Sequence, residues 1–186
     1  MIKRHSNNLG SDNTINNSDI TQQVADTINN QTIIKVSQMP ITKKSSIIQE
    51  VIEGILDLNI DLHPIELDTA DYTIHDKIDH NKIKVYKVAF DLFMQESYLI
   101  EQRLRFLDSN KSATSSQRLY EFVKRVYMKY CGQADPDTRI LCICNQIEND
   151  LNEYPNISSE DKALVAIVVF YAFSKCHIFE KPPIPI

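Results

Sequence analysis

The longest apolar run in the chain, residues 163–173, reads A-L-V-A-I-V-V-F-Y-A-F and contains no charged residue. A membrane-spanning helix needs about 18 or more such residues, so this run is too short to cross a bilayer. A helix that is apolar on every side is instead buried among other helices. The run therefore predicts a central helix surrounded by amphipathic ones, and with it an all-α fold.

Apolar residues recur at helical spacing in several segments that precede this run. The sequence predicts helices over 45–59, from residue 73 to a break near Asn81, from there through Asp108, and over 116–131 and 136–151. Capping-box spacings at residues 46–49 and 73–76, and an acid before proline at 135–136, mark three helix starts. The expected fold is a compact all-α bundle of five or six helices.

The two ends of the chain differ from this helical part. Residues 6–32 are mostly Asn, Ser, Thr, Asp and Gln without an aromatic side chain, so they bury too little apolar area to order themselves alone. The sequence T-I-N-N occurs at 14–17 and again at 27–30, a pattern that also suits short strands pairing between copies. Residues 1–40 are thus predicted to be a flexible or homo-oligomerising, strand-forming segment, and 41–186 a helical domain. Prolines at 182, 183 and 185 predict an extended C-terminal tail.

The familiar motifs for nucleotide binding, for paired-cysteine metal sites and for a nucleophilic serine are absent. The chain has 3 Gly, far apart from one another, which excludes the glycine-rich loops that cradle nucleotide phosphates. Its 4 Cys form no C-x-x-C pair, and no serine lies in a G-x-S-x-G elbow. Because no export signal opens the chain, we expect reduced thiols and a cytoplasmic protein. We therefore expect no enzyme activity, no metal and no cofactor.

Histidines and acids gather in the segment H-D-K-I-D-H at residues 75–80. On a helix, His75 would face Asp79 and Asp76 would face His80, each four positions apart. Such groups can hold a metal ion or transfer protons, although paired charges on a solvated helix face are more common. With no third ligand at a set spacing, we expect charge pairs at the surface.

The helix predicted after residue 116 has a basic side. It carries Arg118, Lys124, Arg125 and Lys129, with tyrosines at 120 and 127 between them. Basic residues interleaved with aromatic ones are typical of a nucleic-acid-binding face. The net charge of −5 weighs against a general polyanion binder, and the tyrosines can equally pack inward. A nucleic-acid-binding sensor domain is therefore the alternative function.

Two stretches resemble the motifs of a known family. Residues 72–86 read Y-T-I-H-D-K-I-D-H-N-K-I-K-V-Y, and residues 172–182 read A-F-S-K-C-H-I-F-E-K-P. Together they resemble the opening and closing motifs of the C-terminal domain of bacterial ABC three-component systems. His75 and His177 stand where the family usually has an acid and a lysine. The similarity covers residues 45–186.

This resemblance implies a non-catalytic adaptor in antiviral defence and biological conflict, one that couples an effector protein to a partner containing an ABC-type ATPase. Homo-oligomerisation through residues 1–40 is a further expectation, and a membrane is not an expected partner. Lys77, Asn81 and Glu180 either dock a partner or pin the tail onto the first helices, with Glu180 pairing with Lys77 or with a partner. The candidate partner-binding residues are Tyr72, Lys77, Asn81, Tyr86, Cys176, Phe179, Glu180 and Pro182.

Overall fold

The computed structural model describes residues 38–58, 73–133, 135–152, 164–175 and 178–183. In this part of the chain it contains seven helices and no strand, so the predicted all-α fold is confirmed. The segment predicted to form strands or to self-associate lies outside the described residues, apart from residues 38–40. The helices are α2 (Ile41–Asp57), α3 (Ile74–His80), α4 (Lys87–Met94), α5 (Ser97–Asn110), α6 (Ser115–Tyr130), α7 (Pro136–Asp150) and α8 (Val165–Ser174).

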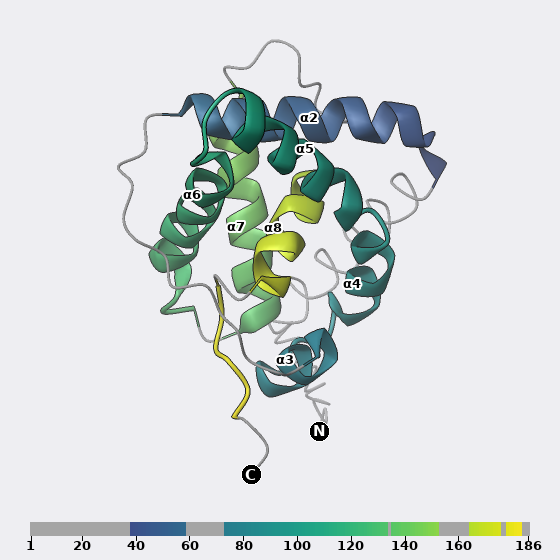
Figure 1. Ribbon diagram of the computed structural model, residues 1–186. Helices are drawn as coiled ribbons and strands as arrows, with labels where there is room; N and C mark the ends of the chain where they lie inside the picture. The colour runs from purple at the N-terminus through teal and green to yellow at the C-terminus, as the bar shows by residue number, and fades with distance from the viewer. Residues whose placement is uncertain (1–37, 59–72, 134, 153–163, 176–177, 184–186) are drawn as a thin grey trace, which may run out of the picture.

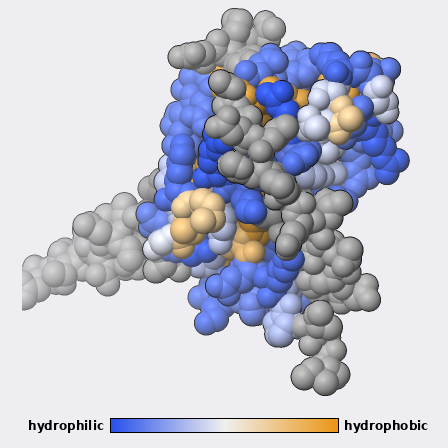
Figure 2. All heavy atoms as spheres, turned by 60° about the vertical axis from the view of Figure 1, so that its left-hand side comes forward, coloured by the Kyte–Doolittle hydropathy of each residue, from blue (hydrophilic) through white to orange (hydrophobic). Residues whose placement is uncertain are grey.

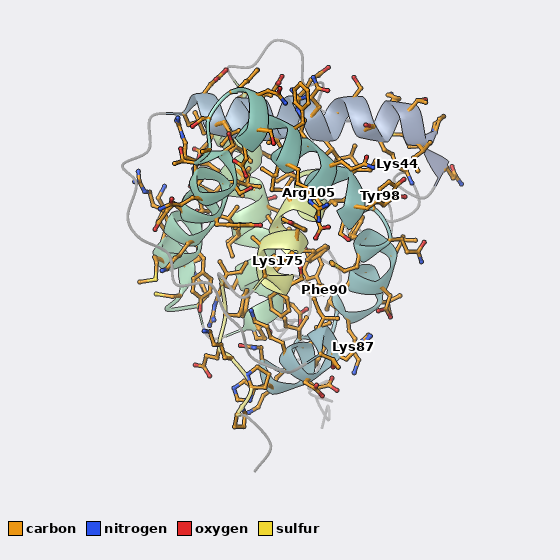
Figure 3. The ribbon with its side chains drawn as sticks, in the orientation of Figure 1. Lys44, Lys87, Phe90, Tyr98, Arg105 and Lys175 are labelled. Carbon is orange, nitrogen blue, oxygen red and sulfur yellow. The ribbon has the colours of Figure 1, made fainter. Side chains whose placement is uncertain are left out.

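Helix α8 lies at the centre of the bundle, as its apolar composition predicts. Every residue from Val165 to Phe173 is buried. Helix α2 crosses one end of the bundle, α4 and α5 cover one side of α8, and α6 and α7 cover the other (Figure 1). Phe90 points from α4 toward α8, where its ring centroid lies 4.2 Å from that of Phe170 and 4.6 Å from that of Phe173 (Figure 3).

Helix α2 begins four residues before the predicted start at residue 45. Pro40 is its N-cap, with φ −57° and ψ 142°, and the Lys44 N–H donates to the Pro40 carbonyl at 3.0 Å. The first turn therefore forms ahead of the serines, which lie on the exposed side of the helix. This early start places the Lys44 side chain in a buried position.

The long helix predicted through Asp108 is two helices, so the described bundle has seven helices and not five or six. Helix α4 ends in a tight turn, in which the Glu96 N–H donates to the Phe93 carbonyl at 3.1 Å. The turn lets α4 and α5 each contact α8, and it brings Glu96 to within 2.6 Å of the Lys44 ammonium. Only 8% of the Lys44 and 13% of the Glu96 side chain is exposed, so a nearly buried ion pair joins the first turn of α2 to the turn between α4 and α5.

A buried carboxylate joins α7 to the segment that leads into α4. Asp137 accepts the N–H groups of Lys84, Val85 and Tyr86 at 2.9, 3.0 and 3.1 Å. Burial raises the pKa of Asp137, while these N–H bonds oppose the rise because they favour the ionised form. One side chain thus satisfies three consecutive backbone amides of a connection more than 50 residues away.

We expect Asp137→Ala to lower the free energy of unfolding by about 2–4 kcal/mol, because three amides lose their acceptor in a largely buried place. Urea unfolding measures this change. The control is Asp135→Ala, which removes a single N-cap bond to the Thr138 amide and should cost about 1 kcal/mol. Equal losses for the two variants would contradict the role given to Asp137.

A second carboxylate joins α2 to α5. Glu53 accepts hydrogen bonds from Arg103 and from the Lys111 ammonium, the latter at 3.2 Å. Partial burial raises the pKa of the Glu53 carboxyl, but the bonds and the positive charges of these two residues outweigh it, so the pKa lies below the usual 4.5. The ionised form of Glu53 therefore stabilises the fold.

Because this pKa is lower in the folded chain than in the unfolded chain, the contribution of Glu53 is present above pH 4.5 and is lost as the pH falls through the folded value. We expect Glu53→Gln to be less stable than the native chain at neutral pH. Urea unfolding at a series of pH values should show this difference shrinking below pH 4.5. A difference that is the same at every pH would contradict the assignment.

Candidate functional site

The two segments that resemble family motifs meet at the end of the bundle opposite α2 (Figure 1). Helix α3 lies within the first segment, and residues 178–182 belong to the second. Side chains near the end of α3 hold the main chain of residues 178–180, at sequence separations of 99 and 101. We call this contact, formed by Lys77, Asn81 and residues 178–183, the tail clamp.

Helix α3 is short, and local bonds define both of its ends. At its start, the Thr73 hydroxyl accepts the Asp76 N–H at 3.2 Å and the Asp76 carboxylate accepts the Thr73 N–H at 2.9 Å, which is the predicted capping box. At its end, Lys82 adopts φ 57°, and the Ile83 N–H returns to the Ile78 carbonyl at 3.1 Å. This is the Schellman arrangement, and it confirms the break predicted near residue 81.

Lys77 is the centre of the tail clamp. Its side chain is almost completely buried, and its ammonium donates to the Phe173 carbonyl at 2.8 Å and to the Ile178 carbonyl at 2.7 Å. The ammonium also lies 4.4 Å from the centre of the Phe173 ring. A buried charge is costly unless it is hydrogen-bonded, and the last carbonyls of a helix are favourable acceptors for a cation. Lys77 therefore ties the end of α8 to the tail.

Asn81 holds the next residue of the tail through the main chain. Its side-chain amide donates to the Glu180 carbonyl at 2.8 Å and accepts the Glu180 N–H at 3.0 Å. The same amide nitrogen donates to the Lys77 carbonyl at 2.9 Å, which fixes its orientation. Lys77 and Asn81 lie one turn apart on the same face, as the sequence predicts.

Phe179 lies between these two attachment points, in the left-handed backbone region with φ 67°. A bulky residue rarely adopts this conformation, which costs about 1–3 kcal/mol where the surroundings impose it. Its ring packs against Tyr127 and Phe173, with centroids 5.2 and 5.4 Å apart. The Arg139 guanidinium lies over the ring at 5.2 Å. The clamp therefore directs the Phe179 ring between the Tyr127 and Phe173 rings and the Arg139 guanidinium, which together we call the aromatic slot.

The structure describes all the candidate partner-binding residues except Tyr72 and Cys176, which lie outside the described residues. Tyr86 packs in the core, 5.7 Å from Phe170 between ring centroids, and Pro182 is buried. The Glu180 side chain is 82% exposed, and its carboxylate lies 3.7 Å from His80 Nε2. Glu180 therefore does not pair with Lys77, one of the two partners considered from the sequence. Its carboxylate faces His80, and Lys77 binds main-chain carbonyls.

Sequence reasoning missed Tyr127 and Arg139, which complete the aromatic slot. Tyr127 belongs to α6 and Arg139 to α7, and in both helices the apolar residues recur at the usual amphipathic spacing. Nothing in the sequence relates position 127 or 139 to position 179, because the contact depends on how α6 and α7 pack. Only the packed structure brings these side chains to the tail.

The acids and histidines of residues 75–80 do not form the predicted i,i+4 pairs. Except for Asp76, which caps its own helix, each faces a different part of the fold. The observed pairs are His75 with Asp91 (3.4 Å), Asp76 with Thr73, Asp79 with Lys87 (2.6 Å) and His80 with Glu180 (3.7 Å). Within the ranges that the structure describes, no three His, Cys, Asp or Glu side chains gather as a metal site would require.

The basic surface of α6 is smaller than the sequence suggests, because Arg118 is used inside the fold. Its guanidinium donates to the carbonyls of Leu56 and Leu58 at the end of α2, at 2.6 and 3.3 Å. The tyrosines at 120 and 127 pack inward, against Tyr171 and Phe179. Figure 2, turned toward the side of α6 and α7, shows a largely hydrophilic surface with small separate apolar spots. The remaining basic residues, which are half-buried or exposed, are Lys124, Arg125 and Lys129.

A pocket of about 210 Å³ lies between α2, α5 and α6. Its two cations are engaged within the fold, since Lys111 binds Glu53 and Arg118 binds main-chain carbonyls. The pocket therefore has the character of a polar surface hollow. It is lined by Glu53, Leu56, Asp57, Leu107, Lys111, Ser112, Ser115 and Arg118.

Three of the four cysteines belong to the described residues, and none of the three is paired with another cysteine there. Cys131 is exposed, Cys142 is half-buried and Cys144 is buried. Burial raises the pKa of the Cys144 thiol, so this residue stays protonated as a small apolar side chain of the core.

No family model, no curated protein and no solved structure matches the chain. The resemblance to ABC three-component systems therefore rests on the two motif segments. Among the described helices, none has both the length and the apolar character that crossing a bilayer requires. The geometry of the tail clamp is the structural feature that bears on function.

We expect Lys77→Met to lower the free energy of unfolding by about 2–4 kcal/mol, because two buried carbonyls lose a charged donor. The tail should also become a site of early proteolytic cleavage, since it loses its first attachment. Urea unfolding and limited proteolysis measure the two effects. The control is Lys175→Met, which removes an exposed bond to Glu101 and should cost less than about 1 kcal/mol. A tail that resists protease in Lys77→Met would contradict this role.

Proposed function

We propose that the chain is a non-catalytic adaptor that binds partner proteins through the surface around the tail clamp. One observation carries the proposal: the two motif segments, far apart in sequence, meet in a single contact that leaves 82% of the Glu180 side chain exposed. The clamp binds the main chain of this residue, so its backbone is fixed while its side chain, 3.7 Å from His80 Nε2, faces solvent.

An ordered extended segment is a favourable docking element, because its conformational entropy has already been lost before a partner binds. Main-chain bonds from Lys77 and Asn81 fix the tail on either side of Phe179. Beyond them, Glu180 and Lys181 are exposed, next to the half-exposed His80. The surface therefore presents charges of both signs on a fixed backbone.

The roles of the buried charged groups favour an adaptor over an enzyme. Lys44 binds Glu96, Lys77 binds two carbonyls and Asp137 binds three amides. Each of these groups joins two elements of the bundle. A catalytic group, in contrast, must reach a substrate with a lone pair or proton to spare.

The resemblance of the motifs implies two partners. One is a component that contains an ABC-type ATPase, and the other is an effector protein of the same bacterial defence system. The adaptor would connect the two in the cytoplasm, and residues 1–40 would add self-association. The use of Arg118 within the fold favours this function over the nucleic-acid-binding alternative, which depends on a wider basic face.

We expect Glu180→Lys to abolish capture of the ATPase component encoded beside this protein, because charge reversal alters the presented surface. The free energy of unfolding should change by less than about 0.5 kcal/mol, since the side chain is exposed. Co-purification with a tagged adaptor and urea unfolding measure the two quantities. The matched control is Asp57→Lys, which reverses the charge of an exposed residue at the end of α2, opposite the tail clamp. This variant should leave capture intact.

Unchanged capture by Glu180→Lys would refute docking at this surface. A fall of several kcal/mol in the free energy of unfolding would show instead that the carboxylate serves only to hold the tail.

A further inference from the structure

We infer that the pocket between α2, α5 and α6 binds a small zwitterion of the α-amino acid class. The pocket lies at the end of the bundle that α2 crosses, opposite the tail clamp (Figure 1). A small molecule bound here leaves the surface around Glu180 uncovered, so its binding is separate from the capture of partner proteins.

The acidic and the basic groups of this pocket come from different elements. Glu53 and Asp57 lie four residues apart on α2, so both face the pocket from that helix. Lys111 directly follows α5, and Arg118 lies in the first turn of α6. A ligand with one charge of each sign can pair with both sets of groups, whereas a ligand with a single charge leaves one set unpaired.

The two cations keep hydrogen-bond donors that the fold does not use. Within the described residues, the Lys111 ammonium gives one of its three donors to Glu53 at 3.2 Å, and 62% of its side chain is exposed. Arg118 donates to main-chain carbonyls from Nη2, and its buried Nε finds no acceptor in this part of the chain. A ligand carboxylate can therefore bind both cations while the bonds of Arg118 to α2 persist.

The two acids offer the complementary half of the site. Asp57 is exposed, and no cation of the described ranges pairs with its carboxylate. Glu53 is bound by Arg103 as well as by Lys111, so it remains compensated when the Lys111 ammonium turns to a ligand. A ligand ammonium thus meets two carboxylates, one of which has no cation of its own.

The size and the apolar lining of the pocket restrict the rest of the ligand. A cavity of about 150 Å³ holds a benzene molecule, so the 210 Å³ available here suits roughly eight or nine non-hydrogen atoms. Leu56 and Leu107 belong to the lining and offer apolar contact beside the charged groups. An amino acid with a branched aliphatic side chain, such as L-leucine, combines this size with both charges.

The test compares three compounds that share one carbon skeleton, each titrated into the full-length chain at neutral pH. L-Leucine carries both charges, 4-methylpentanoate lacks the ammonium group, and 3-methylbutylamine lacks the carboxylate. We expect calorimetric or NMR titration to give an affinity for L-leucine about tenfold tighter than for either analogue, because each analogue leaves one set of charged groups unpaired.

Two variants assign the charges to their partners. Lys111→Met should weaken the binding of L-leucine and of 4-methylpentanoate but not that of 3-methylbutylamine. Asp57→Asn should weaken the binding of L-leucine and of 3-methylbutylamine but not that of 4-methylpentanoate. Both side chains are exposed, and circular dichroism checks that the variants fold. The matched control is Lys129→Met, an exposed lysine in the last turn of α6, which should leave all three affinities unchanged.

Three results would overturn the inference. One is no binding of L-leucine at about 10 mM, a concentration at which even a millimolar affinity is measurable. Another is equal affinity for the three compounds, and the third is an effect of Lys129→Met as large as that of Lys111→Met. Because these titrations involve no other protein, their failure would leave the proposed adaptor function untouched.

Discussion

The ammonium group of Lys77 lies where three parts of the chain meet: helix α3, the end of helix α8 and the tail. A lysine at this depth is tolerated only if carbonyl oxygens replace its water, and two carbonyls do so here. The constraint works in both directions, because the same two carbonyls are satisfied by the lysine. The position of the tail, the path of Phe179 and the exposure of Glu180 all depend on it.

The same constraint separates buried from exposed side chains in the two motif segments. The side chains that resemble a family motif divide into two sets, one that faces the core and one that faces solvent. Lys77, Tyr86 and Phe179 are buried and maintain the shape of the surface, whereas Glu180 is exposed and can contact a partner. In the adaptor that we propose, the buried residues of the motif would act through the shape of the surface and need not touch the partner.

The sequence predicts those features that depend on neighbouring residues. The central position of α8, the capping box at Thr73 and the acid-proline start of α7 all follow from local patterns. The pair of Lys44 with Glu96 does not, since the residues are 52 positions apart, and it joins the first turn of α2 to the turn between α4 and α5. Only packing reveals such partners, and the aromatic slot around Phe179 was missed for the same reason.

The place of α8 in the chain has a consequence for biosynthesis. It is the last of the described helices, and α2, α4, α5, α6 and α7 all pack on it. These helices also pack on one another, but during translation the faces that they turn toward α8 emerge uncovered. Because exposed apolar surface promotes aggregation, the core is completed, and this hazard ends, only after residue 173 has left the ribosome.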